Sequence, residues 1–218
     1  MSDSQLVGLA KDFFQNSLDS SPTSAIMRGH KKYFDQIEEL TEEQFQKEKD
    51  IVDTFIQRLN AIEKDNLTSR EKVTHGMLEF ALSSNKDSLL DRSWEFGAGV
   101  AGFTGFLIDY NQQMFVPDSE SADMMLKRLE LYKRLYTQIA DVQKLGLNNN
   151  RVATERNLLR TIDQLENYLA SSLDQDPLLL VNFSPEISDS EISEWKDKAK
   201  NIIEVNIRPT VSAYLDQL

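Results

Sequence analysis

The chain has 218 residues, of which 40% are hydrophobic, with only 8 glycines and 5 prolines, so the composition favours a folded, helix-rich domain over a disordered chain. The net charge of −12 argues against nucleic-acid binding, because phosphate backbones are bound by clustered lysines and arginines. The acidity favours solubility over the attraction of basic peptides. The absence of cysteine excludes disulfides and thiolate metal sites. No membrane-spanning run or signal peptide is evident, so we expect a cytoplasmic location and no membrane contact.

Apolar spacing of three and four residues predicts a first helix over residues 3–18. A short helix follows, with Ser21 as its cap, Pro22 at its first position and Gly29 at its end. Two longer helices are then predicted over 41–64 and 68–88. Their starts carry the capping-box patterns Thr41-x-x-Gln44 and Thr68-x-x-Glu71.

The helix over 68–88 contains Val73, Met77, Phe80 and Ala81, which we expect to face the core. Residues 91–120 change character, because four glycines and an apolar run follow one another closely. This segment is predicted to be irregular, and it holds the sharpest motif of the chain, GAGVAG at 97–102. The motif fits the G-x-G-x-x-G dinucleotide pattern, but that pattern needs a preceding strand, and the sequence ahead of it is helical in character. A loop between helices is the more economical interpretation.

Three further helices are predicted in the second half, over 121–145, 152–173 and 189–217. The first has a stripe from Met125 to Val142, and Gly146 is interpreted as its left-handed stop. The second is expected to face inward through Leu159, among others. The third begins at the capping box Ser188-x-x-Glu191, and Pro209 should kink it.

The predicted fold is therefore all-α, a bundle of six or more mostly antiparallel helices with an irregular glycine-rich segment near 95–118. We expect residues 1–218 to form one helical domain, with a candidate sub-boundary near 91–120.

The sequence gives little indication of a catalytic metal site or of a catalytic nucleophile. A catalytic zinc needs about three side-chain ligands, and the only histidines, His30 and His75, are far apart in the sequence. His75 is interpreted as a surface or satisfied, partly buried residue. Neither cysteine nor G-x-S-x-G is present. We therefore predict no catalytic residue, no cofactor-binding residue and no metal ligand in this chain.

The order of several short patterns resembles a bacterial family, domain-of-unknown-function family 885. The patterns are Pro22–Ala25–Gly29, Tyr33–Phe34, Arg128–Leu129, Arg134–Leu135, Asp176–Pro177–Leu178 with Phe183, and a last helix with Pro209 and Tyr214. Members of that family resemble gluzincin-like zinc peptidases, with helical walls around a metal held in their second half. The resemblance implies that this chain is the N-terminal half of such a protein, and that zinc belongs to a C-terminal half.

From this resemblance we expect the chain to supply one wall and part of the substrate channel, and to be inactive alone. The alternative is an independent helical protein-interaction module. Expected partners are the C-terminal catalytic half, a second copy of the chain, or peptides. Cleft-facing or interface residues are expected at Gly97, Gly99, Gly102, Phe103, Gly105 and Phe106. Exposed apolar surface is also expected at Tyr214 and Leu215.

Overall fold

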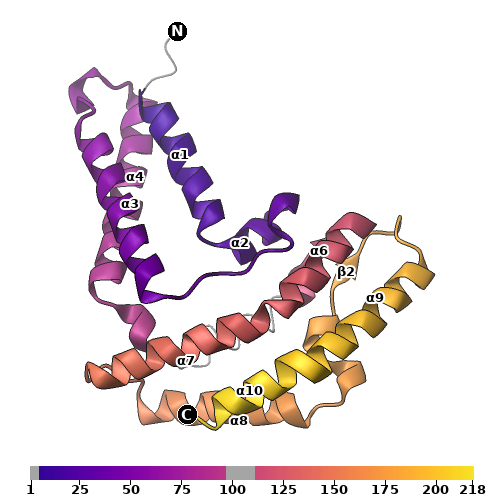
Figure 1. Cartoon of the computed structure of the whole chain (residues 1–218). Helices are drawn as coiled ribbons and strands as arrows, with labels where there is room; N and C mark the ends of the chain where they lie inside the picture. The colour runs from indigo at the N-terminus through magenta and orange to yellow at the C-terminus, as the bar shows by residue number, and fades with distance from the viewer. Residues whose placement is uncertain (1–4, 97–110) are drawn as a thin grey trace. The chain divides into compact units, whose positions relative to one another are not determined.

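The computed structural model describes residues 5–96 and 111–218, and these are mainly helical (Figure 1). The helices are α1 (Gln5–Asp19), α2 (Pro22–Met27), α3 (Glu42–Asn60), α4 (Ser69–Leu90), α6 (Ser119–Glu130), α7 (Tyr132–Asn148), α8 (Glu155–Ala170), α9 (Asp189–Ile202) and α10 (Arg208–Leu215). Two-residue strands, β1 (Phe115–Val116) and β2 (Asn182–Phe183), pair in parallel. The prediction of an all-α fold is confirmed.

The chain divides into two compact units that alternate along the sequence. Unit 1 contains residues 1–20 and 40–94, and unit 2 contains residues 21–39 and 95–218. The expected single domain with a sub-boundary near 91–120 stays a prediction, because compactness alone does not show whether either unit folds independently.

Unit 1 is a three-helix assembly of α1, α3 and α4 (Figure 1). Its core contains Leu6 and Leu9 of α1, together with Val52, Phe55, Leu59, Leu78 and Leu82 of α3 and α4. Both helix starts have caps, as predicted. Thr68 and Glu71 form a complete capping box. At Thr41 the hydroxyl accepts from the backbone N–H of Gln44, but the Gln44 side chain donates to Glu48, so the capping box predicted there is only half formed.

Helix α4 packs with the face opposite to the expected one. His75, Leu78 and Leu82 are buried, whereas Val73, Met77 and Phe80 are 63%, 68% and 75% exposed. Ala81 is half-buried. The prediction that Val73, Met77 and Phe80 face the core is therefore wrong. Apolar residues lie on two faces of this helix, and α1 and α3 cover only one of them.

In unit 2, the predicted helix over 121–145 is two consecutive helices, α6 and α7, which meet at Leu131. Its predicted stripe, from Met125 to Val142, is buried. The stripe packs against the C-terminal helices, with Trp195, Ala199, Ile203, Ile207 and Val211 buried there. On α8, Thr161, Leu165 and Tyr168 are buried, but Leu159 is 53% exposed, so its expected inward orientation is wrong.

The C-terminal helix continues through Pro209 by widening into one π-helical turn, Ile203–Ile207, between α9 and α10. A proline removes one backbone donor and crowds the carbonyl four residues earlier, and a wider turn relieves that conflict. The structure therefore has a π-turn ahead of Pro209, and the predicted kink stays a prediction. Tyr214, expected at the surface, is 2% exposed, and Leu215 is half-buried, because α10 packs on α7 and α8.

None of the described helices has the length and apolar character needed to cross a membrane.

Candidate functional site

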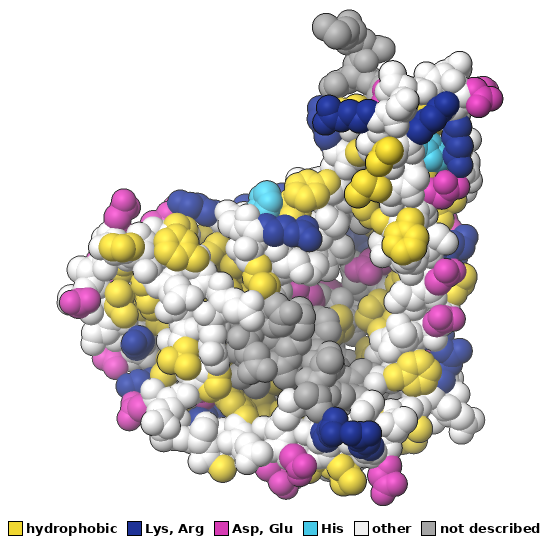
Figure 2. All heavy atoms as spheres, turned by 180° about the vertical axis from the view of Figure 1, so that it is seen from behind, with side chains coloured by type: hydrophobic (Ala, Val, Ile, Leu, Met, Phe, Trp, Pro, Cys, Tyr) yellow, Lys and Arg dark blue, Asp and Glu magenta, His cyan; other side chains and the backbone are white. Residues whose placement is uncertain are grey.

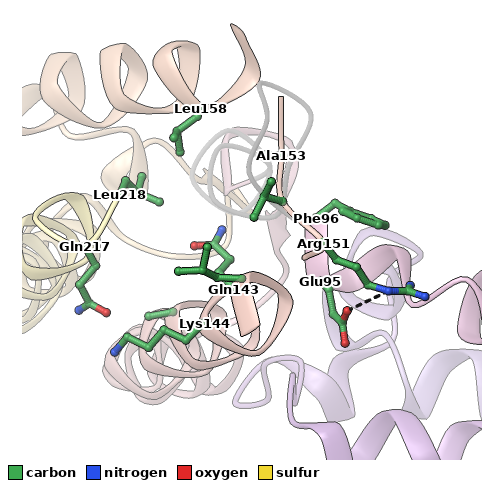
Figure 3. Close-up of a pocket in the computed structure, with 12 residues that line it drawn as sticks. Glu95, Phe96, Gln143, Lys144, Arg151, Ala153, Leu158, Gln217 and Leu218 are labelled. Carbon is green, nitrogen blue, oxygen red and sulfur yellow. Dashed lines mark ion pairs between the residues drawn. The ribbon is translucent and has the colours of Figure 1, made fainter. Parts of the chain in front are cut away.

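A cavity in unit 2 lies where α7 ends and the chain turns toward α8 (Figure 3). It measures about 160 Å³ and is referred to below as the α7–α8 cavity. Its wall is mainly apolar, and charged or amide groups lie at its edges. The lining residues are Glu95, Phe96, Ala140, Gln143, Lys144, Leu147, Arg151, Val152, Ala153, Leu158, Gln217 and Leu218.

Gly146 explains how this corner is built. It lies inside α7 and has no positive φ, so its predicted role as a left-handed stop is wrong; Asn150, with φ 56°, takes the left-handed conformation instead. A Cβ on Gly146 would lie 2.6 Å from the Arg151 carbonyl oxygen and 2.7 Å from that of Glu95. The glycine therefore permits two backbone segments to approach the helix closely.

A buried carboxylate forms one side of the cavity. Glu95 is 2% exposed, its Oε1 accepts from the Asn149 side chain at 3.3 Å, and its Oε2 lies 3.6 Å from Arg151 Nε (Figure 3). The Arg151 guanidinium also lies over the Phe96 ring, 5.9 Å from its centroid. Because Arg151 balances Glu95, and Lys144 adds a positive charge at the rim, the cavity suits an apolar group attached to a polar chain.

A second polar centre is buried beneath the segment 21–39. Arg128 of α6 is completely buried, and its Nη2 donates to Thr23 Oγ1 at 2.5 Å. Its Nη1 donates to the Gln36 carbonyl oxygen. Glu38 accepts from the Thr23 amide at 2.9 Å and the Thr23 hydroxyl at 2.8 Å, and its Oε2 lies 3.9 Å from Arg128 Nη2. We call Arg128, Thr23, Gln36 and Glu38 the Arg128 network.

Further ion pairs hold the same segment. Lys31 pairs with Asp118, which caps α6, and this contact lowers the pKa of Asp118 to about 2. At the other end, Glu39 pairs with Arg134 at 3.0 Å and accepts from the Gln138 side chain. The segment 21–39 is therefore fixed to α6 and α7 along its length.

Another buried carboxylate links the α8 end to the last helix. Asp176 is completely buried; its Oδ2 accepts from Arg208 at 3.0 and 3.1 Å, and its Oδ1 accepts from the Leu178 amide. Arg208 also donates to the Ser171 carbonyl oxygen at 2.9 Å. Because Arg208 directly follows the π-turn, this turn sets the position of its guanidinium.

The comparisons with known proteins identify the family. A family model described as "Bacterial protein of unknown function (DUF885)" matches residues 22–218, which is most of the chain. The chain belongs to this family. Searches of curated proteins and of solved structures found no match.

The DUF885 match begins at Pro22, and several of the residues that carried the resemblance are buried in unit 2, whereas Gly29 and Pro209 are exposed. Ala25, Tyr33 and Phe34 are at most 1% exposed, and Gly29 has φ 83°, a conformation that favours glycine. Arg128 and Asp176 are the centres of the two buried networks described above. These residues therefore contribute to the packing and the buried polar contacts of unit 2.

The residues expected to face a cleft, Gly97, Gly99, Gly102, Phe103, Gly105 and Phe106, lie outside the described residues. The chain directly before Gly97 is helical, with α4 followed by a 3-10 turn at Ser93–Phe96, so no strand precedes the GAGVAG motif within residues 5–96. This is not the local context of a dinucleotide-binding turn.

The two histidines lie in different units. His75, on α4, is only 2% exposed, and its Nε2 has no hydrogen-bond partner among the described residues. The expectation of a surface or satisfied histidine is thus wrong, because α4 turns this side chain inward. His30 belongs to unit 2 and makes an edge-on contact with Tyr33. No group of three or more potential metal-ligating side chains occurs in the described part of the chain.

Sequence reasoning missed the Arg128 network and the α7–α8 cavity. A signal for the first was present, because Arg128 lies three residues after Met125 and four before Tyr132, on the apolar face of its helix. An arginine in that position must find buried acceptors. The cavity had no comparable signal, since it depends on how three distant segments meet.

Proposed function

We propose that this chain is the helical, non-catalytic wall of a zinc-peptidase-like protein and that the α7–α8 cavity receives an apolar side chain of a peptide. Membership of DUF885 supports the broader part of this proposal through the resemblance of that family to zinc peptidases. The observation that carries the finer part is the apolar cavity with a cationic rim beside a balanced Glu95–Arg151 pair.

The chemistry of the cavity fits binding better than catalysis. Ala153, Val152 and Leu158 offer apolar contact, and Lys144 at the rim can interact with a peptide carbonyl or carboxylate. Among the described residues, Glu95 has the one carboxylate side chain that lines the cavity, and it is paired with Arg151, so these residues offer no pair of carboxylate side chains for acid–base catalysis. Zinc and the hydrolytic groups would come from the catalytic half that we expect as partner.

The test compares two tryptophan substitutions near the start of α8. Ala153→Trp should fill the cavity, whereas Leu159→Trp changes an exposed residue outside it. Fluorescence anisotropy with labelled peptides that differ only in one central residue, Leu, Phe or Asp, measures binding. We expect the Leu and Phe peptides to bind, Ala153→Trp to weaken binding at least about tenfold, and Leu159→Trp to leave it unchanged. Equal binding by both variants, or preference for the Asp peptide, would overturn the proposed peptide site.

A second candidate function is the independent helical interaction module. The exposed Val73, Met77 and Phe80 of α4 favour it, because an apolar stripe on a helix is a common protein-contact surface. A pull-down between this chain and a separately expressed catalytic half distinguishes the two functions. Association that assembles a zinc peptidase supports the wall, and its absence supports the module.

A further inference from the structure

The outward face of α4 is an apolar stripe flanked by opposite charges. Val73, Met77 and Phe80 follow one another at four and three residues and are more than 60% exposed. In Figure 2, hydrophobic side chains are visible on the surface of unit 1, at the upper right of the picture. Within unit 1, α1 and α3 pack against the opposite face of α4, where His75, Leu78 and Leu82 are buried.

Charge is distributed unevenly along this face. Arg70 lies one turn before Val73, near the N-terminal end of α4, and Asp87 lies two turns after Phe80, near its C-terminal end; both are exposed. The spacing from 70 through 73, 77, 80, 84 to 87 places all these positions on one side of the helix. The stripe therefore runs from a basic end to an acidic end.

We propose that α4 is a self-association surface, on which a second copy of this chain packs its own α4 in antiparallel orientation. In that arrangement Met77 of each copy lies beside Phe80 of the other, and Arg70 of each lies opposite Asp87 of the other. A parallel arrangement would instead place Arg70 against Arg70 and Asp87 against Asp87. The charges thus favour a two-fold, antiparallel helix pair.

The surface between the apolar residues suits close helix packing. Gly76 is exposed, and open space surrounds the position that a Cβ would occupy. Ser84 adds a second small residue farther along the same face. A single pair of helices buries less than the roughly 1,600 Å² of a standard interface, so we expect a weak, concentration-dependent dimer. This inference is independent of the α7–α8 cavity, because every residue that carries it belongs to unit 1.

Charge reversal in the full chain tests the orientation. Sedimentation velocity over a series of protein concentrations measures the dimer dissociation constant for the parent chain, Arg70→Glu, Asp87→Arg and the double variant. We expect each single variant to weaken dimerisation at least about fivefold, and the double variant to restore it, because it exchanges both charges of the pair. Raised salt should reduce these differences.

A separate variant tests the apolar part of the proposed dimer contact. Phe80→Lys should abolish the dimer at concentrations where the parent associates, and Leu159→Lys, which changes another exposed apolar residue but in unit 2, should leave it intact. Circular dichroism confirms that each variant keeps its helices. A parent chain that stays monomeric at all concentrations, or a double charge variant no better than the singles, would overturn the proposal. In either case peptide binding at the α7–α8 cavity would remain measurable.

Discussion

Arg128 illustrates how one buried charge can organise a fold. Its guanidinium is fully buried, and its acceptors come from residues 23 and 36, about one hundred positions earlier in the chain. Glu38 lies beside it at 6% exposure and accepts twice from Thr23. Removing the cation would leave a buried carboxylate without its compensating charge.

We expect Arg128→Met to lower the free energy of unfolding by about 3–5 kcal/mol, since breaking a buried ion pair by removing one partner is strongly destabilising. The matched control is Arg134→Met, whose ion pair with Glu39 is about half exposed and should contribute less than about 1 kcal/mol. Urea denaturation followed by circular dichroism measures both. Equal losses in the two variants would show that burial of Arg128 carries no special cost.

Buried tyrosines make the protein sensitive to alkali. Burial raises the pKa of Tyr132 to about 12 and that of Tyr214 to about 12, and it raises the pKa of Tyr136 and Tyr168 as well. An unfolded tyrosine ionises near pH 10. The folded state therefore holds more protons than the unfolded state above that pH, and the stability present below pH 10 is lost as the pH rises toward 12.

The substitution Tyr214→Phe measures how much Tyr214 contributes to this loss of stability at alkaline pH. The parent chain should lose stability between pH 9 and pH 11, and the variant should lose about 1 kcal/mol less over the same interval, because phenylalanine cannot ionise. Urea midpoints at the two pH values give the comparison. The variant also loses the hydrogen bonds between Tyr214 and Gln143, but this loss lowers its stability at both pH values and so cancels in the difference. If the variant and the parent lost the same stability over this interval, the raised pKa of Tyr214 in the folded protein would be contradicted.

At the scale of helices, two glycines in helix interiors have opposite roles. Gly146 in α7 lies against the backbone of Glu95 and Arg151, whereas Gly76 in α4 has open space around it. A helix stop was predicted at Gly146, and nothing in the local sequence of either glycine indicates these surroundings, because they depend on how the backbone of Glu95 and Arg151 folds against α7.

Gly146→Ala should therefore destabilise the protein by about 1–3 kcal/mol through overpacking against carbonyl oxygens that cannot move freely. Gly76→Ala should instead stabilise it by about 0.5–1 kcal/mol, because alanine is the better helix former. Thermal unfolding of the two variants gives the test. A gain in stability for Gly146→Ala would show that the close approach of Arg151 and Glu95 is not maintained.

The helices and the cavity differ in how far they can be predicted from the sequence. Within the described residues, apolar periodicity predicted where the long helices lie, although it merged α6 and α7 into one, because helical spacing of apolar residues and caps such as Thr68–Glu71 are local properties. The direction of α4 was misjudged, because its sequence offers two apolar faces and only the neighbouring helices decide between them. The α7–α8 cavity was not foreseen, because it forms where Glu95, Arg151 and Leu218 meet from separate parts of the chain.

At the scale of the whole molecule, the proposed wall function makes a prediction about metal and activity. The purified chain should hold no stoichiometric zinc and cleave no peptide, because it has two histidines in different units and no cysteine. Elemental analysis and mass spectrometry of incubated peptides measure the two properties. One tightly held zinc per chain that is lost in His75→Ala would contradict this prediction, and His30→Ala serves as the comparison.

The alternation of the two units along the sequence has a consequence for synthesis on the ribosome. Residues 21–39 belong to unit 2, but all of residues 40–94, which belong to unit 1, are made before the rest of unit 2. Thr23 and Glu38 must therefore wait, without their buried partner, until Arg128 has left the exit tunnel. During that interval Tyr33 and Phe34, which are buried in the folded protein, lack the part of unit 2 that is made after residue 94. A gene fragment that starts at residue 95 would lack the whole segment and leave Arg128 without its acceptors, so unit 2 should be expressed only with residues 21–39 reattached.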